Sequence, residues 1–212
     1  MSIRIDPQQR ILPPGKPSRS RRDETAKKTK EVDKALEISP AVGESVELRV
    51  IFTESQIQRR VAQMASRVNH DYCGRTLHLV TLLENSFMFL ADLTRQLQMP
   101  VVCHFLKARV KDRNWHGVPL REINYAATGS FKGKDVLLVD GVLQTGVTED
   151  FLLLSIKDQE PNSLRTATLI EKVTSRKVSL TPDYVGFRAD GQFLVGYGLG
   201  LNGEYSHLPY IA

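Results

Sequence analysis

Hydrophobic residues recur along the chain with two spacings, one typical of helices and one typical of strands. Spacings of three and four positions begin after Thr53 and predict a helix that ends near Asn69. Its apolar face holds Ile57, Val61, Met64, Ala65 and Val68. Thr53 and Gln56 have the spacing of a capping box, which marks the start of this helix. Helical spacing returns at residues 86–98 and 148–157.

Short runs rich in β-formers lie between these helices. They cover residues 47–51, 77–82, 101–105, 135–140, 167–171, 184–187 and 193–197. Residues 135–140 are almost wholly apolar, which is typical of a central parallel strand covered on both faces. Strands that alternate with helices predict an α/β fold with a central, doubly wound parallel sheet flanked by helices.

Two segments break this pattern. Residues 107–131 have a mixed composition and predict a hairpin or a mobile lid. Residues 1–45 contain five prolines, few large apolar side chains and a cluster of basic residues, Arg19, Arg21, Arg22, Lys27, Lys28 and Lys30. We expect a disordered basic tail over residues 1–45 and one folded domain over residues 46–212. Such a tail could contact nucleic acid or an acidic partner; a solvated tail without a partner is the alternative.

Composition narrows the class of protein. The chain has 212 residues and a formal net charge of +5, which is largely a property of the tail. Cys73 and Cys103 lack the spacing of a zinc site or a disulfide framework, so we expect a reducing, cytoplasmic location. The five histidines show no metal-binding spacing. No apolar run approaches the roughly 18 residues of a membrane span, and we expect no membrane contact.

The segment that indicates chemistry is residues 136–148, where an apolar strand leads through small residues into a helix. Backbone N–H groups at Thr145, Gly146, Val147 and Thr148 would surround a phosphate at the helix N-terminus, and two threonine hydroxyls could also donate. Ligands of open parallel sheets bind at the carboxyl ends of strands, where this segment lies. An ordinary turn in which Thr148 caps the helix is the alternative interpretation.

This segment resembles the phosphoribosyl-pyrophosphate loop of type I phosphoribosyltransferases. Residues 54–72 and 82–93 resemble the family's first helix and its pyrophosphate loop with the helix that follows. Residues 182–187, 193–199 and 208–211 resemble the C-terminal part of the hypoxanthine-guanine branch. The resemblance implies a type I phosphoribosyltransferase fold with a small hood made from the ends of the domain. It also implies transfer of a phosphoribosyl group to a 6-oxopurine, with Mg²⁺ neutralising the departing pyrophosphate.

Several positions depart from the family pattern at the strand-end motif. Asp140 is the one acid that remains of three, because Gly141 replaces the carboxylate that holds the ribose hydroxyls. Gln144 stands at the position of the proton acceptor near purine N7 and has no titratable group. The catalytic positions implied by the resemblance, Asp140 and Gln144, are therefore altered.

The phosphate-facing positions also depart from the pattern. The pyrophosphate loop implied by the resemblance is Glu84, Asn85 and Ser86, with an anion in place of the usual lysine. The magnesium-associated aspartate aligns with Gly200 and the arginine of the final loop with Ser206. We therefore expect an active site that is degenerate in its acidic and basic positions.

The purine-binding positions survive. The resemblance makes Lys172 the donor to the 6-oxo group, Phe193 the aromatic that stacks on the base, and Leu194 the residue whose backbone meets the purine edge. A donor at O6 favours hypoxanthine or guanine over adenine. Without the resemblance, Lys172 is an ordinary lysine at a strand end and Phe193 a core aromatic.

Three functional hypotheses follow. The leading one is a purine-salvage-family protein that retains binding of a purine nucleotide or phosphoribosyl pyrophosphate, with weak or absent transferase activity. The second is an active 6-oxopurine phosphoribosyltransferase with a rearranged site, which would use Mg²⁺; the first needs no cofactor. The third is a non-catalytic regulatory or scaffold protein whose tail meets a partner. A homo-oligomer is expected in each case.

Overall fold

The computed structural model describes residues 48–106, 109–115, 118–124, 129–191, 193–200 and 204–212. The basic tail expected at residues 1–45 lies outside these residues, as does the side chain of Glu84.

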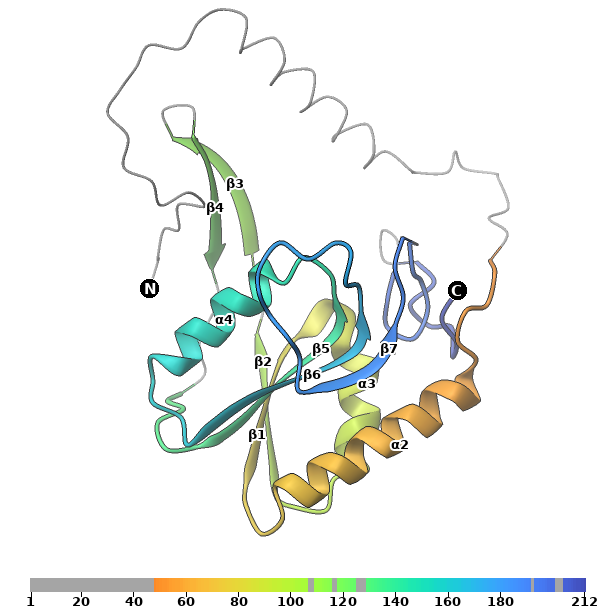
Figure 1. Ribbon diagram of the computed structural model, residues 1–212, viewed down its shortest axis with the longest axis horizontal. Helices are drawn as coiled ribbons and strands as arrows, with labels where there is room; N and C mark the ends of the chain where they lie inside the picture. The colour runs from red at the N-terminus through yellow and green to blue at the C-terminus, as the bar shows by residue number, and fades with distance from the viewer. Residues whose placement is uncertain (1–47, 107–108, 116–117, 125–128, 192, 201–203) are drawn as a thin grey trace, which may run out of the picture. The chain divides into compact units, whose positions relative to one another are not determined.

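A five-stranded, all-parallel sheet forms the centre of the domain (Figure 1). The strands lie in the order β2-β1-β5-β6-β7. Their bounds are β1 Leu77–Leu82, β2 Val101–Leu106, β5 Asp135–Leu143, β6 Ser163–Glu171 and β7 Tyr184–Arg188. The apolar strand β5 lies in the middle, with Val139 paired to Thr81 on β1 and to Ala167 on β6. The prediction of a central parallel strand is confirmed.

Helices cover both faces of this sheet (Figure 1). Helices α2 (Glu54–Asp71) and α3 (Leu83–Thr94) pack on one face, with Leu137 and Val139 of β5 in the same core. Helix α4 (Val147–Lys157) packs on the other face, where Phe151 and Leu152 meet Val136 and Leu138. Successive residues of β5 therefore point alternately at the two layers, as the pleat of a strand requires.

The first helix forms as its sequence predicts. Thr53 and Gln56 make a reciprocal capping box, in which the Gln56 N–H donates to Thr53 Oγ1 and the Thr53 N–H donates to Gln56 Oε1. The five apolar positions of its predicted face are all buried. Helix α2 ends at Asp71, two residues beyond the predicted end.

Two predicted strands are wrong. Among the described residues of 47–51 there is no strand; Phe52 makes an isolated bridge to Ile211 instead. Residues 193–197 also form no strand, because Gly196, Tyr197 and Gly198 all have positive φ angles, which turn the chain away from an extended path. The Val195 N–H donates to the Ala212 carbonyl at 2.9 Å and the Ile51 N–H to the Ile211 carbonyl at 2.8 Å, so the two ends of the domain meet in the expected hood.

The excursion at residues 107–131 contains a hairpin. Strands β3 (Arg109–Trp115) and β4 (Val118–Asn124) pair antiparallel, with Arg109 opposite Asn124 and Trp115 opposite Val118. The prediction of a hairpin is confirmed for these residues.

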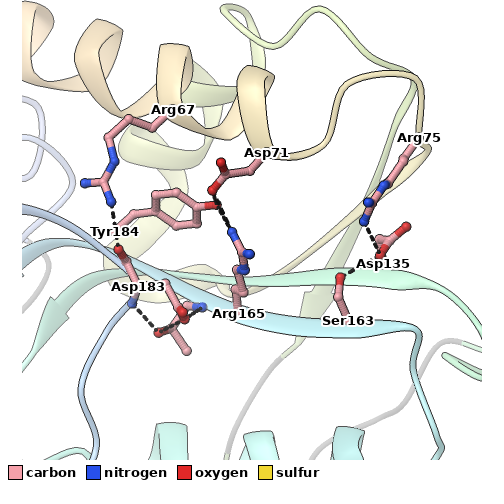
Figure 2. Close-up of polar contacts among 9 residues, drawn as sticks. Arg67, Asp71, Arg75, Asp135, Ser163, Arg165, Asp183 and Tyr184 are labelled. Atoms are coloured by element: carbon pink, nitrogen blue, oxygen red, sulfur yellow. Dashed lines mark hydrogen bonds and ion pairs between the residues drawn. The ribbon is translucent and has the colours of Figure 1, made fainter.

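A polar network fixes α2 to the amino ends of β6 and β7 (Figure 2). The Arg165 guanidinium donates to Asp71 Oδ2 at 2.6 Å and to the Tyr184 hydroxyl at 2.8 Å. The Tyr184 hydroxyl donates to the same carboxylate oxygen at 2.6 Å. Arg67 adds a bond to the Asp183 carbonyl at 3.3 Å. These contacts stabilise the amino ends of the strands, at the opposite end of the sheet from residues 140–148.

In the described part of the chain, no helix is long and apolar enough to cross a membrane. Cys73 and Cys103 are both free thiols.

Candidate functional site

The carboxyl end of β5 leads into a sharp turn, here called the strand-end loop (residues 144–148). Gly146 is the N-cap of α4 and has φ of 77°, a left-handed conformation that favours glycine. A Cβ at Gly146 would lie 2.8 Å from Val178 Cγ2 and 3.2 Å from Arg176 NH1. Both the backbone angle and the packing therefore require glycine at this position.

The backbone of this loop is held from behind. The Lys177 N–H donates to the Thr145 carbonyl at 2.9 Å, and the Lys172 N–H donates to the Leu143 carbonyl at 3.0 Å. No side chain caps the start of α4, although Thr145 Oγ1 lies 3.5 Å from the Val147 nitrogen. The Val147 N–H meets Thr145 Oγ1 and the Glu149 N–H meets its own carboxyl, at a helix N-terminus of the kind that favours an anion.

Asp140 is buried where β5 meets this loop. The Ser86 hydroxyl donates to Asp140 Oδ1 at 3.3 Å and accepts from the Gly141 N–H at 3.0 Å. Asp140 Oδ2 has no hydrogen-bond partner among the described residues. Burial raises the pKa of Asp140 to about 6, against a Ser86 hydrogen bond that lowers it. This carboxyl is therefore within reach of protonation near neutral pH.

Gly141 has no room for a side chain. A Cβ there would collide with the backbone carbonyl oxygen of Asn85 in α3. Helix α3 therefore approaches β5 so closely at position 141 that only glycine fits there.

The segment that resembles a pyrophosphate loop is helical. Glu84, Asn85 and Ser86 lie in the first turn of α3, which begins at Leu83 immediately after β1. The expectation of a loop before a helix at residue 86 is corrected: the helix starts three residues earlier. Ser86 is 1% exposed and its hydroxyl binds the end of β5, while Asn85 is exposed.

Of the positions expected to meet a purine, Lys172 directly follows β6 beside the strand-end loop, and Phe193 and Leu194 follow β7. Lys172 is 7% exposed, and burial lowers the pKa of its ammonium group while Asp190 partly offsets the effect. Asp190 Oδ1 also accepts from the Thr174 N–H and hydroxyl, each at 2.9 Å, which joins residues 172–174 to the segment before Phe193. Phe193 is 65% exposed, as a stacking surface requires, and Leu194 is buried.

The structure thus brings together part of the expected set. Asp140, Gln144, Thr145 and Lys172 adjoin one another through the ends of β5 and β6. Gln144 is exposed, and Thr145, Val147 and Thr148 are half-buried.

Sequence reasoning missed a group of charged residues behind the loop. Arg176 NH2 lies 3.1 Å from Glu171 Oε1, and Arg188 Nε lies 3.1 Å from Glu171 Oε2. Glu149, in the first turn of α4, has its pKa raised to about 7 by burial and then by the nearby Asp140. One signal was present: Glu149 precedes Leu152 and Ile156 at helical spacing, on the buried face of α4.

Comparison with known proteins agrees with this architecture. A family model described as the phosphoribosyl transferase domain matches residues 51–200. The hypoxanthine-guanine phosphoribosyltransferase of Dictyostelium discoideum is 33% identical over 166 residues, which cover 76% of this chain and 92% of that protein.

Solved structures give the same result. A hypoxanthine-guanine phosphoribosyltransferase from Bacillus anthracis has 32% identity and a TM-score of 0.68, covering 79% of this chain and 98% of its own. The hypoxanthine phosphoribosyltransferase of Trypanosoma cruzi, studied for the role of its C-terminal region in oligomeric state and activity, has 29% identity and a TM-score of 0.69. The match covers 80% of this chain and 93% of that chain. The chain described here therefore belongs to the type I phosphoribosyltransferase family, in its hypoxanthine-guanine branch.

Proposed function

We propose that this chain binds a 6-oxopurine nucleotide, or phosphoribosyl pyrophosphate, at the strand-end loop and has weak or no transferase activity. The observation that carries the proposal is a contrast within one motif. The loop has a left-handed turn at Gly146 before the N-terminus of α4, while only one of the three acids of the family pattern remains, Asp140, which is buried and hydrogen-bonded to Ser86.

Binding is supported by backbone geometry. Groups that donate to a phosphate here are main-chain amides at a helix N-terminus, and these do not depend on the side chains at positions 141 and 144. The hydroxyls of Thr145 and Thr148 are on half-exposed residues of the same turn. A donor at Lys172 and an exposed ring at Phe193 would then select a 6-oxopurine over adenine.

Weak catalysis is supported by the side chains. Gln144 is exposed at the loop but cannot accept a proton, so general acid-base help of roughly 10²–10⁴-fold is not available from it. Glu84 stands where the family pattern has a lysine beside the departing pyrophosphate, and a like charge about 4 Å away would cost about 4 kcal/mol before screening.

Hypoxanthine-guanine phosphoribosyltransferases use Mg²⁺, but this chain offers little to hold it. Among the described residues, no three Asp, Glu, His or Cys side chains are grouped to bind a metal ion. Position 141 has no carboxylate, and the carbonyl of Asn85 occupies the space that one would need. The residues present do not fit a protein-held ion at this strand end, so Mg²⁺ would be carried by the substrate's own phosphates.

Calorimetric titration with GMP, IMP and phosphoribosyl pyrophosphate, each with and without Mg²⁺, tests the proposal. We expect micromolar or tighter binding of GMP or IMP that does not require Mg²⁺. Absence of binding by all three ligands would overturn the proposal and favour a scaffold role.

We also propose that the protein forms a homo-oligomer. Strand β2 is the edge of the sheet and exposes apolar side chains at Val102 and Phe105, 41% and 52% exposed. Light scattering after size exclusion should give a mass above that of one 23.9 kDa chain. Any acidic partner of the tail and a cytoplasmic location stay predictions.

A further inference from the structure

We propose that Glu149 and Arg176 set the affinity of the strand-end loop for a phosphate monoester, which binds with uptake of a proton by the Asp140–Glu149 pair. The inference rests on the proposed function and names two residues that the family resemblance does not assign.

The alternation of residues along β5 and the helical spacing of α4 place Asp140 and Glu149 on the facing sides of these two elements. Val136 and Leu138 of β5 point into the core beneath α4, and Asp140 continues this row by two residues. Leu152 and Ile156 form the buried stripe of α4, and Glu149 extends it by one turn toward the helix start. This places the two carboxyls on facing sides of β5 and the first turn of α4, close enough for Asp140 to raise the pKa of the half-buried Glu149.

Arg176 supplies the positive charge on the same side. Its side chain is 13% exposed and packs against Gly146, where a Cβ would lie 3.2 Å from Arg176 NH1. Its NH2 group is paired with Glu171, but NH1 is buried and has no hydrogen-bond partner among the described residues. Asp140 Oδ2 is likewise buried and unpartnered. A cation and an acid pair with spare hydrogen-bonding capacity thus lie beneath an anion-binding turn.

The charges of this cluster decide the potential at the loop. Arg176 acts on both acids and is itself bound to Glu171, which the more exposed Arg188 also contacts, while Ser86 contacts Asp140 from α3. With both acids ionised, three carboxylates stand against two guanidinium groups. With one proton on the pair, the charges balance, and an incoming phosphate dianion is repelled less.

The ligand-free protein should already show this proton. Burial, and then repulsion from Asp140, raise the pKa of Glu149 to about 7, and burial raises the pKa of Asp140 to about 6. A raised carboxyl pKa adds stability that is fully present below the unfolded value and is lost as pH rises through the folded value. The urea concentration at the wild-type unfolding midpoint should therefore decrease as pH rises from 4.5 to 7. Glu149→Gln should make this decrease smaller.

The deciding experiment is titration of GMP between pH 7 and 8.5, where the phosphate of GMP is already a dianion. Wild-type affinity should fall by about three- to tenfold over this range. Calorimetry in two buffers of different ionisation enthalpy should show net proton uptake on binding. Glu149→Gln should bind more tightly at pH 8.5 and abolish both the pH slope and the proton uptake.

Asp150→Asn is the matched control, because it removes one negative charge from the same helical turn one residue away from the buried stripe. It should shift affinity equally at every pH. Arg176→Gln should weaken binding at every pH, with circular dichroism confirming that it folds. A wild-type affinity that is flat from pH 7 to 8.5, or a slope that survives Glu149→Gln, would overturn this inference alone. No GMP binding at any pH would overturn the proposed function and the inference together.

Discussion

Under the proposed function, single residues at the end of β5 separate phosphate binding from catalysis. Gly146 forms a left-handed turn that leads into the N-terminus of α4, where backbone N–H groups favour an anion. Gln144 and Gly141, in contrast, have lost the carboxylates that the family pattern places there. A function confined to backbone atoms survives such changes, and a function that needs a titratable side chain does not.

We predict that wild-type turnover with hypoxanthine or guanine is well below the roughly 1–10³ s⁻¹ of ordinary enzymes at saturating substrate and Mg²⁺. Gln144→Asp restores a proton acceptor and should raise the rate at least tenfold, since positioned acid-base groups contribute about 10²–10⁴-fold. Gln144→Asn is the control, because asparagine has the shape of aspartate but cannot accept a proton. Steady-state assays compare the three proteins; ordinary wild-type rates would contradict the degenerate site.

Restoring an acid at position 141 should fail for a steric reason. Gly141→Ala would bring a Cβ into the Asn85 carbonyl, so α3 and β5 must move apart, which costs about 1–3 kcal/mol. The Ser86 hydroxyl of α3, which accepts from the Gly141 N–H of β5, would be displaced as well. Urea denaturation measures the loss. At Gly191 a Cβ meets no atom within 4 Å, so Gly191→Ala carries only the strain of a methyl group at φ of 74° and should cost less; an equal cost for both would contradict the close approach.

At the scale of elements, the sequence predicted those helices and strands whose formation depends on residues close together in the chain. The capping box at Thr53 and the apolar face of α2 needed only neighbouring residues, and both are confirmed. The apolar run of β5 likewise predicted its central place. The helical first turn of α3 was missed, because the family pattern indicated a loop at residues that here continue directly from strand to helix.

The charged cluster behind the strand-end loop could not be predicted in the same way. Asp140, Glu149 and Arg176 come from a strand, a helix and a connection, and Arg176 follows Glu149 by 27 positions in the sequence. Arg176 reaches this part of the protein because residues 172–178 pack beside the strand-end loop, which only the folded chain shows. Failure of the predicted strand at residues 193–197 has a similar origin, since its β-formers meet the C-terminus through turns with positive φ.

The network between α2, β6 and β7 allows a matched pair of substitutions (Figure 2). Tyr184→Phe removes a hydroxyl that donates to Asp71 and accepts from Arg165, and should cost about 1–2 kcal/mol because both charged partners are partly exposed. Tyr72→Phe removes a buried hydroxyl that has no hydrogen-bond partner in the described part of the chain, and should be neutral or stabilising. Urea denaturation of both variants at pH 7 distinguishes them. Equal losses would contradict the assigned network.

Acid should weaken the same network. The Tyr184 hydrogen bond, followed by Arg165, lowers the pKa of Asp71. A lowered carboxyl pKa adds stability above the unfolded value that is lost as pH falls through the folded value. The difference in stability between the wild type and Tyr184→Phe should therefore shrink below about pH 4.

At the scale of the whole molecule, the domain and the tail should behave as separate parts. The family match spans residues 51–200, and none of it falls within residues 1–45. The tail's composition offers few apolar side chains to bury.

We therefore predict that deleting residues 1–45 leaves the melting temperature within a few degrees of the full-length value and leaves GMP affinity unchanged. Differential scanning calorimetry and the same titration measure both properties. A fall of many degrees would show that the segment is docked on the domain.

The most direct test of the account is the affinity of GMP compared with guanosine, which has the same base and ribose but no phosphate, for the wild type and for Thr148→Val. A hydrogen bond to a charged group contributes about 1.5–3 kcal/mol, and valine keeps the shape of threonine without its hydroxyl. The account predicts that GMP binds more tightly than guanosine, and that Thr148→Val weakens GMP by more than tenfold while leaving guanosine unchanged. Equal affinity for the two ligands, with no effect of Thr148→Val on either, would mean that the strand-end loop is an ordinary turn and binds no phosphate.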